Sequence, residues 1–108
     1  MSEKLNIKRP EDCVSAEEVR NEIDNIDHQI MMLYGERHKF VEEIVRFKND
    51  EESIVAHDRK KQVIKDRRKW AIENGLDPDT FEKMYNLLIE SNIKRELEIL
   101  KMKKTSSI

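Results

Sequence analysis

The stretch that decides the fold runs from Ser15 to Lys48 and reads SAEEVRNEIDNIDHQIMMLYGERHKFVEEIVRFK. Positions with alternating steps of four and three lie on one face of an α-helix. The positions on this face are Val19, Ile23, Ile26, Ile30, Leu33, Arg37, Phe40, Ile44 and Phe47. All except Arg37 are apolar, so the sequence predicts one long helix with an apolar stripe.

This helix is too long for the chain to cover alone. Ser15 and Glu18 have the spacing of a capping box, which predicts that the helix begins there. At about 1.5 Å per residue, a helix over residues 15–48 is roughly 50 Å long, whereas a compact chain of this size has a radius of gyration near 13 Å. We therefore expect a second copy of the chain to cover part of the stripe in an intertwined homodimer.

The composition also favours helices. The chain has 108 residues, of which 41% are charged and 37% hydrophobic, and only two Gly and two Pro are present. Sandwiches and barrels need more turn-forming residues than this, and the length is that of one small domain. The predicted fold class is all-α, with three helices and a long first helix.

The chain divides into three parts. Residues 1–14 lack periodicity and contain Pro10, so they are expected to form an extended N-terminal arm. Residues 15–100 form the expected helical domain. Residues 101–108 follow the last apolar position of the pattern and are expected to form a frayed C-terminal tail.

Two breaks separate the helices of this domain. Residues 49–56 interrupt the pattern and predict a polar loop, which a second helix over 57–74 follows. Gly75 is a typical residue after a helix end, while Asp77 and Pro78 are typical of a helix start. The inward positions expected on the second helix are Val63, Trp70 and Ala71, and those on the third are Tyr85, Leu88, Ile89, Ile93, Leu97 and Leu100.

The charge balance argues against several classes of partner. Lys and Arg number 21 and Asp and Glu number 23, for a net charge of -2. Proteins that bind nucleic acid or an anionic membrane usually have an excess of positive charge, which this chain lacks. The single Cys13 cannot form an internal disulfide, and no apolar run reaches the roughly 18 residues of a membrane span. We expect a cytoplasmic protein without nucleic-acid or membrane partners.

The sequence has no motif for a metal or a cofactor. His28 and His38 have no His or Cys at helical ligand spacing, so no metal is expected. No Gly-rich loop or nucleophile with an adjacent base is present. The basic run Arg67-Arg68-Lys69 is interpreted as a solvated face.

Four charged residues stand out on the helical faces. Lys48 follows Arg37 by eleven residues, which brings it within about 20° of the same angle around the helix. Glu96 lies on the apolar face of the third helix, and Arg20 lies about 100° from Arg37, so it would reach only the pocket of a second copy. Internal ion pairs are one explanation for Arg37, Lys48 and Glu96. A pocket for a small anion is the other.

Together these residues resemble the AroQ-type chorismate mutases, which have the type II all-helical fold. The resemblance covers most of the chain. It is carried by the following residues in order: Arg20-x-x-Ile23-Asp24-x-Ile26-Asp27, Gly35-x-Arg37, Phe47-Lys48, Leu88-Ile89 and the polar residue Glu96. The isochorismate pyruvate lyase branch is the most similar, through Pro10-Glu11-Asp12-Cys13, Val55-Ala56-His57-Asp58-Arg59, Trp70-Ala71 and Glu73-Asn74-Gly75-Leu76-Asp77.

The resemblance implies a role for each unusual charge. It implies a homodimer with two sites, each formed mainly by one chain. Arg37 and Lys48 would bind the dianionic substrate, the Arg20 of the other chain would complete the site, and Glu96 would lie near the ether oxygen of the substrate. Lys48 and Glu96 would be the catalytic residues of a pericyclic reaction that needs no cofactor.

The resemblance leaves three functions open. Many mutases of this fold have an Arg-Glu pair early in the second helix. This chain has Lys60-Lys61 there. The lyase branch also lacks the glutamate. The favoured function is therefore conversion of isochorismate to salicylate and pyruvate, with chorismate mutase as a side activity. The alternatives are a chorismate mutase that makes prephenate for aromatic amino acids, and a non-catalytic helical dimerisation module.

Overall fold

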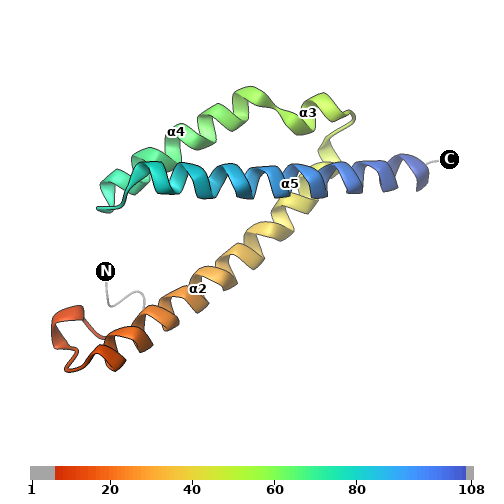
Figure 1. Cartoon of the computed structure of the whole chain (residues 1–108). Helices are drawn as coiled ribbons and strands as arrows, with labels where there is room; N and C mark the ends of the chain where they lie inside the picture. Colours follow the sequence, from red (N-terminus) through yellow and green to blue (C-terminus); the bar gives the residue numbers. More distant parts are fainter. Residues whose placement is uncertain (1–6, 107–108) are drawn as a thin grey trace. The chain divides into compact units, whose positions relative to one another are not determined.

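The computed structural model describes residues 7–106, and every regular element among them is a helix (Figure 1). This confirms the predicted all-α class with a long first helix. Two compact units divide the chain, residues 1–39 and residues 40–108. In chain order the elements are η1 (Pro10–Asp12), α2 (Ala16–Glu43), η2 (Ile44–Phe47), α3 (Glu51–Val55), α4 (His57–Glu73) and α5 (Pro78–Ser106).

The serine half of the predicted capping box is formed at the start of α2. The Ser15 Oγ accepts a hydrogen bond from the Glu18 N–H at 3.1 Å. The Glu18 carboxylate accepts one from the Lys8 Nζ, and the Lys8 N–H donates to the Glu22 Oε2 at 2.8 Å. These contacts fasten the arm to α2, and the short 3-10 helix η1 interrupts its predicted extended course. Residues 1–6 of the predicted arm lie outside the described part of the chain.

The apolar stripe of α2 is exposed in the single chain. Within Ala16–Glu43, all of which the structure describes, no residue is buried. Leu33 is 70% exposed and Phe40 is 75% exposed. Side chains of this kind are normally covered, so the stripe is an open apolar surface of the single chain.

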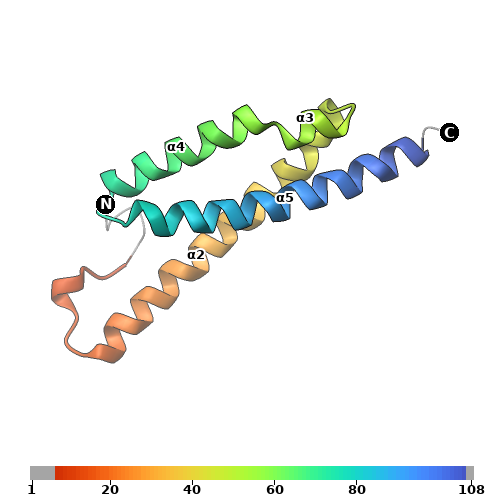
Figure 2. The ribbon, with the colours of Figure 1, turned by 45° about the horizontal axis from the view of Figure 1, so that its top comes forward.

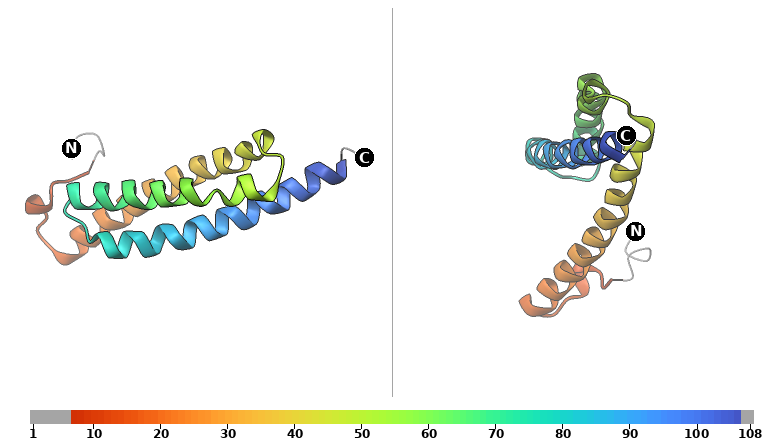
Figure 3. Two further views of the ribbon diagram at one scale, coloured as in Figure 1. Left: turned by 90° about the horizontal axis from the view of Figure 1, so that it is seen from above. Right: turned by 90° about the vertical axis from the view of Figure 1, so that its right-hand side faces the viewer.

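In the second unit, α4 and α5 lie side by side (Figures 2 and 3). Val63 and Ala71 of α4 are buried, as predicted. Trp70 is 49% exposed, so its predicted inward position is wrong for the single chain. Its ring instead supports the Arg67 guanidinium, which lies 4.7 Å from the ring centroid and 5.4 Å from that of Tyr85.

A second arginine ties α4 to α5. The Arg68 Nη1 donates to the Asp79 Oδ1 at 2.9 Å and to the Glu82 Oε1 at 2.8 Å. Arg67 thus lies against aromatic rings, and Arg68 bonds carboxylates of α5. The prediction that both lie on a solvated face is therefore wrong. Lys69 is exposed, as expected for that face.

The turn between α4 and α5 has the predicted chemistry. The Leu76 N–H donates to the Ala71 carbonyl at 2.8 Å, the Gly75 N–H donates to the Ile72 carbonyl at 3.1 Å, and Gly75 has a φ of 72°. This pair of bonds is a Schellman motif, which ends a helix on a left-handed residue. The Asp77 Oδ2 accepts hydrogen bonds from the N–H and hydroxyl of Thr80, which confirms the predicted cap of α5.

Two predicted boundaries are wrong. Residues 51–55 of the expected polar loop form the short helix α3, because the Asp50 carboxylate caps its first turn and Ile54 is buried. Helix α5 continues six residues past Leu100 to Ser106, so residues 101–106 of the expected frayed tail are helical. Residues 107–108 of that tail lie outside the described residues.

Gly75 offers a test of this turn. A Cβ at this position would meet nothing within 4 Å, so a substitution affects only the left-handed backbone. We expect Gly75→Ala to lower the free energy of unfolding by about 1–2 kcal/mol. Gly75→Asn is the matched control and should lose less, because Asn tolerates this conformation. Urea unfolding at one protein concentration measures both, and equal losses would contradict the turn geometry.

Candidate active site

Arg20 and Arg37 both lie on α2 in the first unit. Arg20 is exposed and Arg37 is partly buried. Seventeen residues separate them, which is about 25 Å along the helix at about 1.5 Å per residue. This distance is too long for a small dianion to touch both guanidinium groups of one chain.

Lys48 lies at the exit of η2, in the second unit. It is partly buried, and its backbone is extended, with φ -108° and ψ 138°. The Lys48 N–H donates to the Val45 carbonyl at 3.0 Å, and the Lys48 carbonyl accepts from the Lys103 Nζ at 3.1 Å. Both peptide groups of Lys48 are therefore hydrogen-bonded.

The residues after Lys48 are ordered by Asp50. The Asp50 Oδ1 accepts from the Ser53 N–H at 2.8 Å, and the Asp50 carbonyl accepts from the Ser53 hydroxyl at 2.9 Å. Hydrogen bonding from Ser53 lowers the pKa of Asp50, and the positive charges of Lys104 and Lys48 lower it further. At neutral pH the Asp50 carboxylate is therefore ionised, and its negative charge interacts with the positive charge of Lys48.

Glu96 is placed by the core of the second unit. It is partly buried on α5, one turn before the buried Leu100. Leu100 packs with Val45 and Ile54, and Val45 lies three residues before Lys48. Glu96 and Lys48 therefore extend from two elements that meet at the same small core.

Asn92 is a residue that the sequence reasoning missed. It is 7% exposed and is the sole buried polar residue among those described. It lies one turn before Glu96 on α5, so the two polar groups lie on the same side of the helix. An amide can both donate and accept hydrogen bonds. Its spacing was the available signal, because Asn92 lies three residues after Ile89 and four before Glu96, near the apolar face of α5.

A salt bridge fixes α5 beside these residues. The Arg95 Nε donates to the Glu42 Oε2 at 2.8 Å, which joins α5 to the last turn of α2 within the second unit. This contact raises the pKa of Arg95.

Two grooves on the second unit do not contain the predicted residues. The first, of about 780 Å³, is lined by Glu51, Glu90, Ile93, Lys94, Leu97, Glu98, Leu100, Lys101, Lys104 and Thr105. The second, of about 560 Å³, is lined by His57, Lys60, Lys61, Ile64, Lys65, Arg68 and Asn86. Neither is lined by Lys48 or Glu96. The second groove places Lys60 and Lys61 in a basic lining without a carboxylate.

Metal clusters and membrane-spanning helices are absent from the described part of the chain. Between residues 7 and 106, no three His, Cys, Asp or Glu side chains gather as a metal ion would require. In the same range, no helix has the length and apolar character needed to span a bilayer.

These features define an all-helical protein with basic and acidic residues at partly buried positions. The chain matches the family model of chorismate mutase type II over residues 19–97. This range includes Arg20, Arg37, Lys48 and Glu96. The chain belongs to the chorismate mutase type II family, which is a family of enzymes, and the resemblance predicted from the sequence is confirmed.

Two relatives represent different activities. An isochorismate pyruvate lyase of Pseudomonas aeruginosa is 35% identical over 92 residues, which are 85% of this chain and 91% of the relative. A chorismate mutase of Methanocaldococcus jannaschii is 32% identical over 76 residues, which are 69% of this chain and 77% of the relative. Both relatives are enzymes, whereas a non-catalytic dimerisation module has no support among them.

Proposed function

We propose that this chain is an isochorismate pyruvate lyase, which converts isochorismate to salicylate and pyruvate. The observation that carries the proposal is the 35% identity to a lyase across 85% of the chain. The Lys60-Lys61 pair adds support, because a mutase of this fold often has a glutamate there to hold the ring hydroxyl of chorismate. Chorismate mutase is the second candidate, favoured by the 32% identity to a mutase.

The substrate fits a site made of cations. Isochorismate carries two carboxylates and an enolpyruvyl ether. Arg37 and the Arg20 of a second copy would each bind a carboxylate in a bidentate manner, which holds the enolpyruvyl group folded over the ring. Holding this reactive shape removes much of the entropic part of the barrier.

The remaining groups act on the ether. As the C–O bond to the ring breaks, negative charge builds on the ether oxygen, and the Lys48 ammonium stabilises it. A hydrogen of the ring moves to the methylene carbon of the departing enolpyruvyl group. The ring becomes salicylate and the departing group becomes pyruvate, so no further reactant or cofactor is needed.

A homodimer is part of the proposal. The exposed stripe of α2 offers a long apolar surface, and a second copy of the same helix has the matching stripe. The 25 Å between Arg20 and Arg37 supports the same arrangement, because each arginine would serve a different site. We place this dimer in the cytoplasm.

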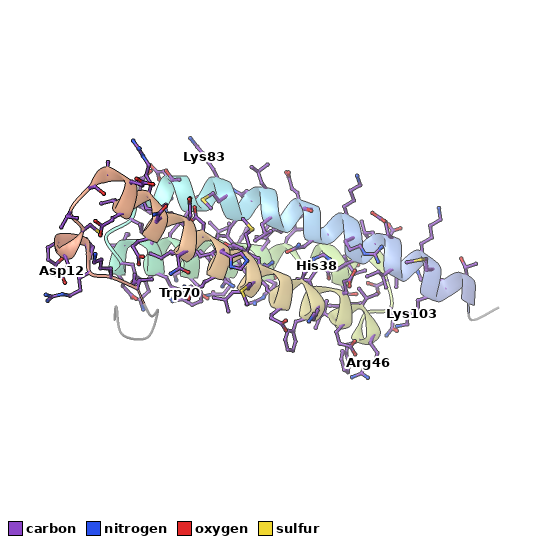
Figure 4. The ribbon with its side chains drawn as sticks, turned by 90° about the horizontal axis from the view of Figure 1, so that it is seen from below. Asp12, His38, Arg46, Trp70, Lys83 and Lys103 are labelled. Atoms are coloured by element: carbon purple, nitrogen blue, oxygen red, sulfur yellow. The ribbon has the colours of Figure 1, made fainter. Side chains whose placement is uncertain are left out.

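The product assay tests the proposed function directly. Purified protein incubated with isochorismate should release equal amounts of salicylate and pyruvate. Lys48→Ala should lower kcat by about 100-fold or more while the fold stays intact. Lys83→Ala, which changes an exposed lysine of α5, is the control (Figure 4). Prephenate from chorismate without salicylate would favour the second candidate, and normal turnover in Lys48→Ala would refute the site.

The role of Glu96 predicts a pH dependence. Only a protonated Glu96 donates a hydrogen bond to the ether oxygen, whereas the ionised form repels the substrate carboxylates. Turnover should therefore fall as the pH rises through the titration of Glu96. Glu96→Gln should flatten this fall, because an amide donates at every pH, and Glu90→Gln on an exposed position of α5 should leave it unchanged. Identical profiles for all three proteins would exclude the role.

A further inference from the structure

Lys103 makes an unusual set of contacts for a residue near the end of a helix. Its Nζ donates to the carbonyls of Val45 and Arg46, each at 3.2 Å, and to that of Lys48 at 3.1 Å. Figure 4 labels Lys103 and Arg46 at the place where α5 passes η2. An ammonium group has three N–H donors, so the three bonds use all of them.

Two of the three carbonyls, those of Val45 and Arg46, belong to η2, and the third belongs to Lys48, the residue that follows it. The last carbonyls of a helix have no partner within it and carry partial negative charge. These three carbonyls accept hydrogen bonds from the Lys103 ammonium, which neutralises part of their charge. The Val45 carbonyl also accepts a hydrogen bond from the Lys48 N–H. The Lys103 ammonium therefore bonds both the carbonyl that accepts the Lys48 N–H and the carbonyl of Lys48 itself.

A second contact strengthens this attachment. Leu100, one turn before Lys103, packs against Val45 in the core of the second unit. Helix α5 therefore touches η2 through an apolar contact and through a charged one. The apolar contact holds α5 against η2. The hydrogen bonds of Lys103 hold the peptide groups at the end of η2, next to Lys48.

We propose that Lys103 is a positioning residue for Lys48, so that the last turns of α5 take part in setting the reaction geometry. The inference rests on the proposed function, in which the Lys48 ammonium acts on the breaking ether bond. Loss of the three bonds removes the restraint that Lys103 places on the carbonyls before Lys48 and on the Lys48 carbonyl itself. A displacement of about 1 Å at a reacting group can cost up to about 100-fold in rate.

Kinetics separate positioning from a general structural role. Lys103→Met keeps the length of the side chain and removes its donors, and Lys101→Met changes an exposed lysine of the same helix as a control. Lys103→Met should lower kcat by roughly tenfold or more and change KM by less than about twofold, while Lys101→Met changes neither. Circular dichroism and the unfolding midpoint check that both variants are folded.

The same substitution in a Lys48→Ala background gives the sharper result. With no ammonium left to position, Lys103→Met should lower the residual kcat by less than about twofold. An equal loss in both backgrounds would overturn the inference. So would a kcat for Lys103→Met equal to that of Lys101→Met.

A readout that needs no turnover keeps the two proposals apart. Hydrogen exchange of the Lys48 amide should be roughly tenfold faster in Lys103→Met than in Lys101→Met. The reason is that Lys103 no longer holds the Val45 carbonyl, which accepts the Lys48 N–H. If the protein converts neither isochorismate nor chorismate, the proposed function fails, and faster exchange still supports the anchoring of Lys48. Unchanged exchange contradicts that anchoring whether or not the protein is active.

Discussion

The constraint on which the rest depends is an apolar stripe that α2 leaves exposed. Covering a side chain such as Leu33 or Phe40 is worth about 1.5–3 kcal/mol, so several of them provide a strong force for association. A second copy with the same stripe is the occupant we propose. The length of α2 also separates Arg20 from Arg37 by about 25 Å. The two arginines of one chain are therefore assigned to two different sites of the proposed dimer.

The second unit serves the chemistry through a small core. Val45 and Leu100 join η2 to α5, and this contact places Lys48 and Glu96 on elements that meet. The hydrogen bonds around Lys48 then restrict its backbone from both sides, with Lys103 as the donor that reaches it from α5. A fold with few buried residues thus keeps its proposed catalytic lysine in a well-defined place.

Periodicity and caps made most of the fold predictable. The stripe of α2 and the turn chemistry at Gly75 and Asp77 depend on neighbours in the sequence, so local patterns reveal them. Helix α3 is too short to show a period, and it forms because a cap and the buried Ile54 act together. The burial of Asn92 and the contacts of Lys103 depend on packing between distant elements, which no local pattern records.

The central claim is that each active site takes residues from two chains, and mixing inactive variants tests it most directly. Arg20→Ala and Lys48→Ala chains, each expected to have little activity alone, would form mixed dimers in which one site retains both residues. After subunit exchange at equal amounts, verified by mass spectrometry, we predict about a quarter of the wild-type salicylate formation, because half the dimers are mixed and each has one intact site. No recovery despite complete exchange would contradict the account.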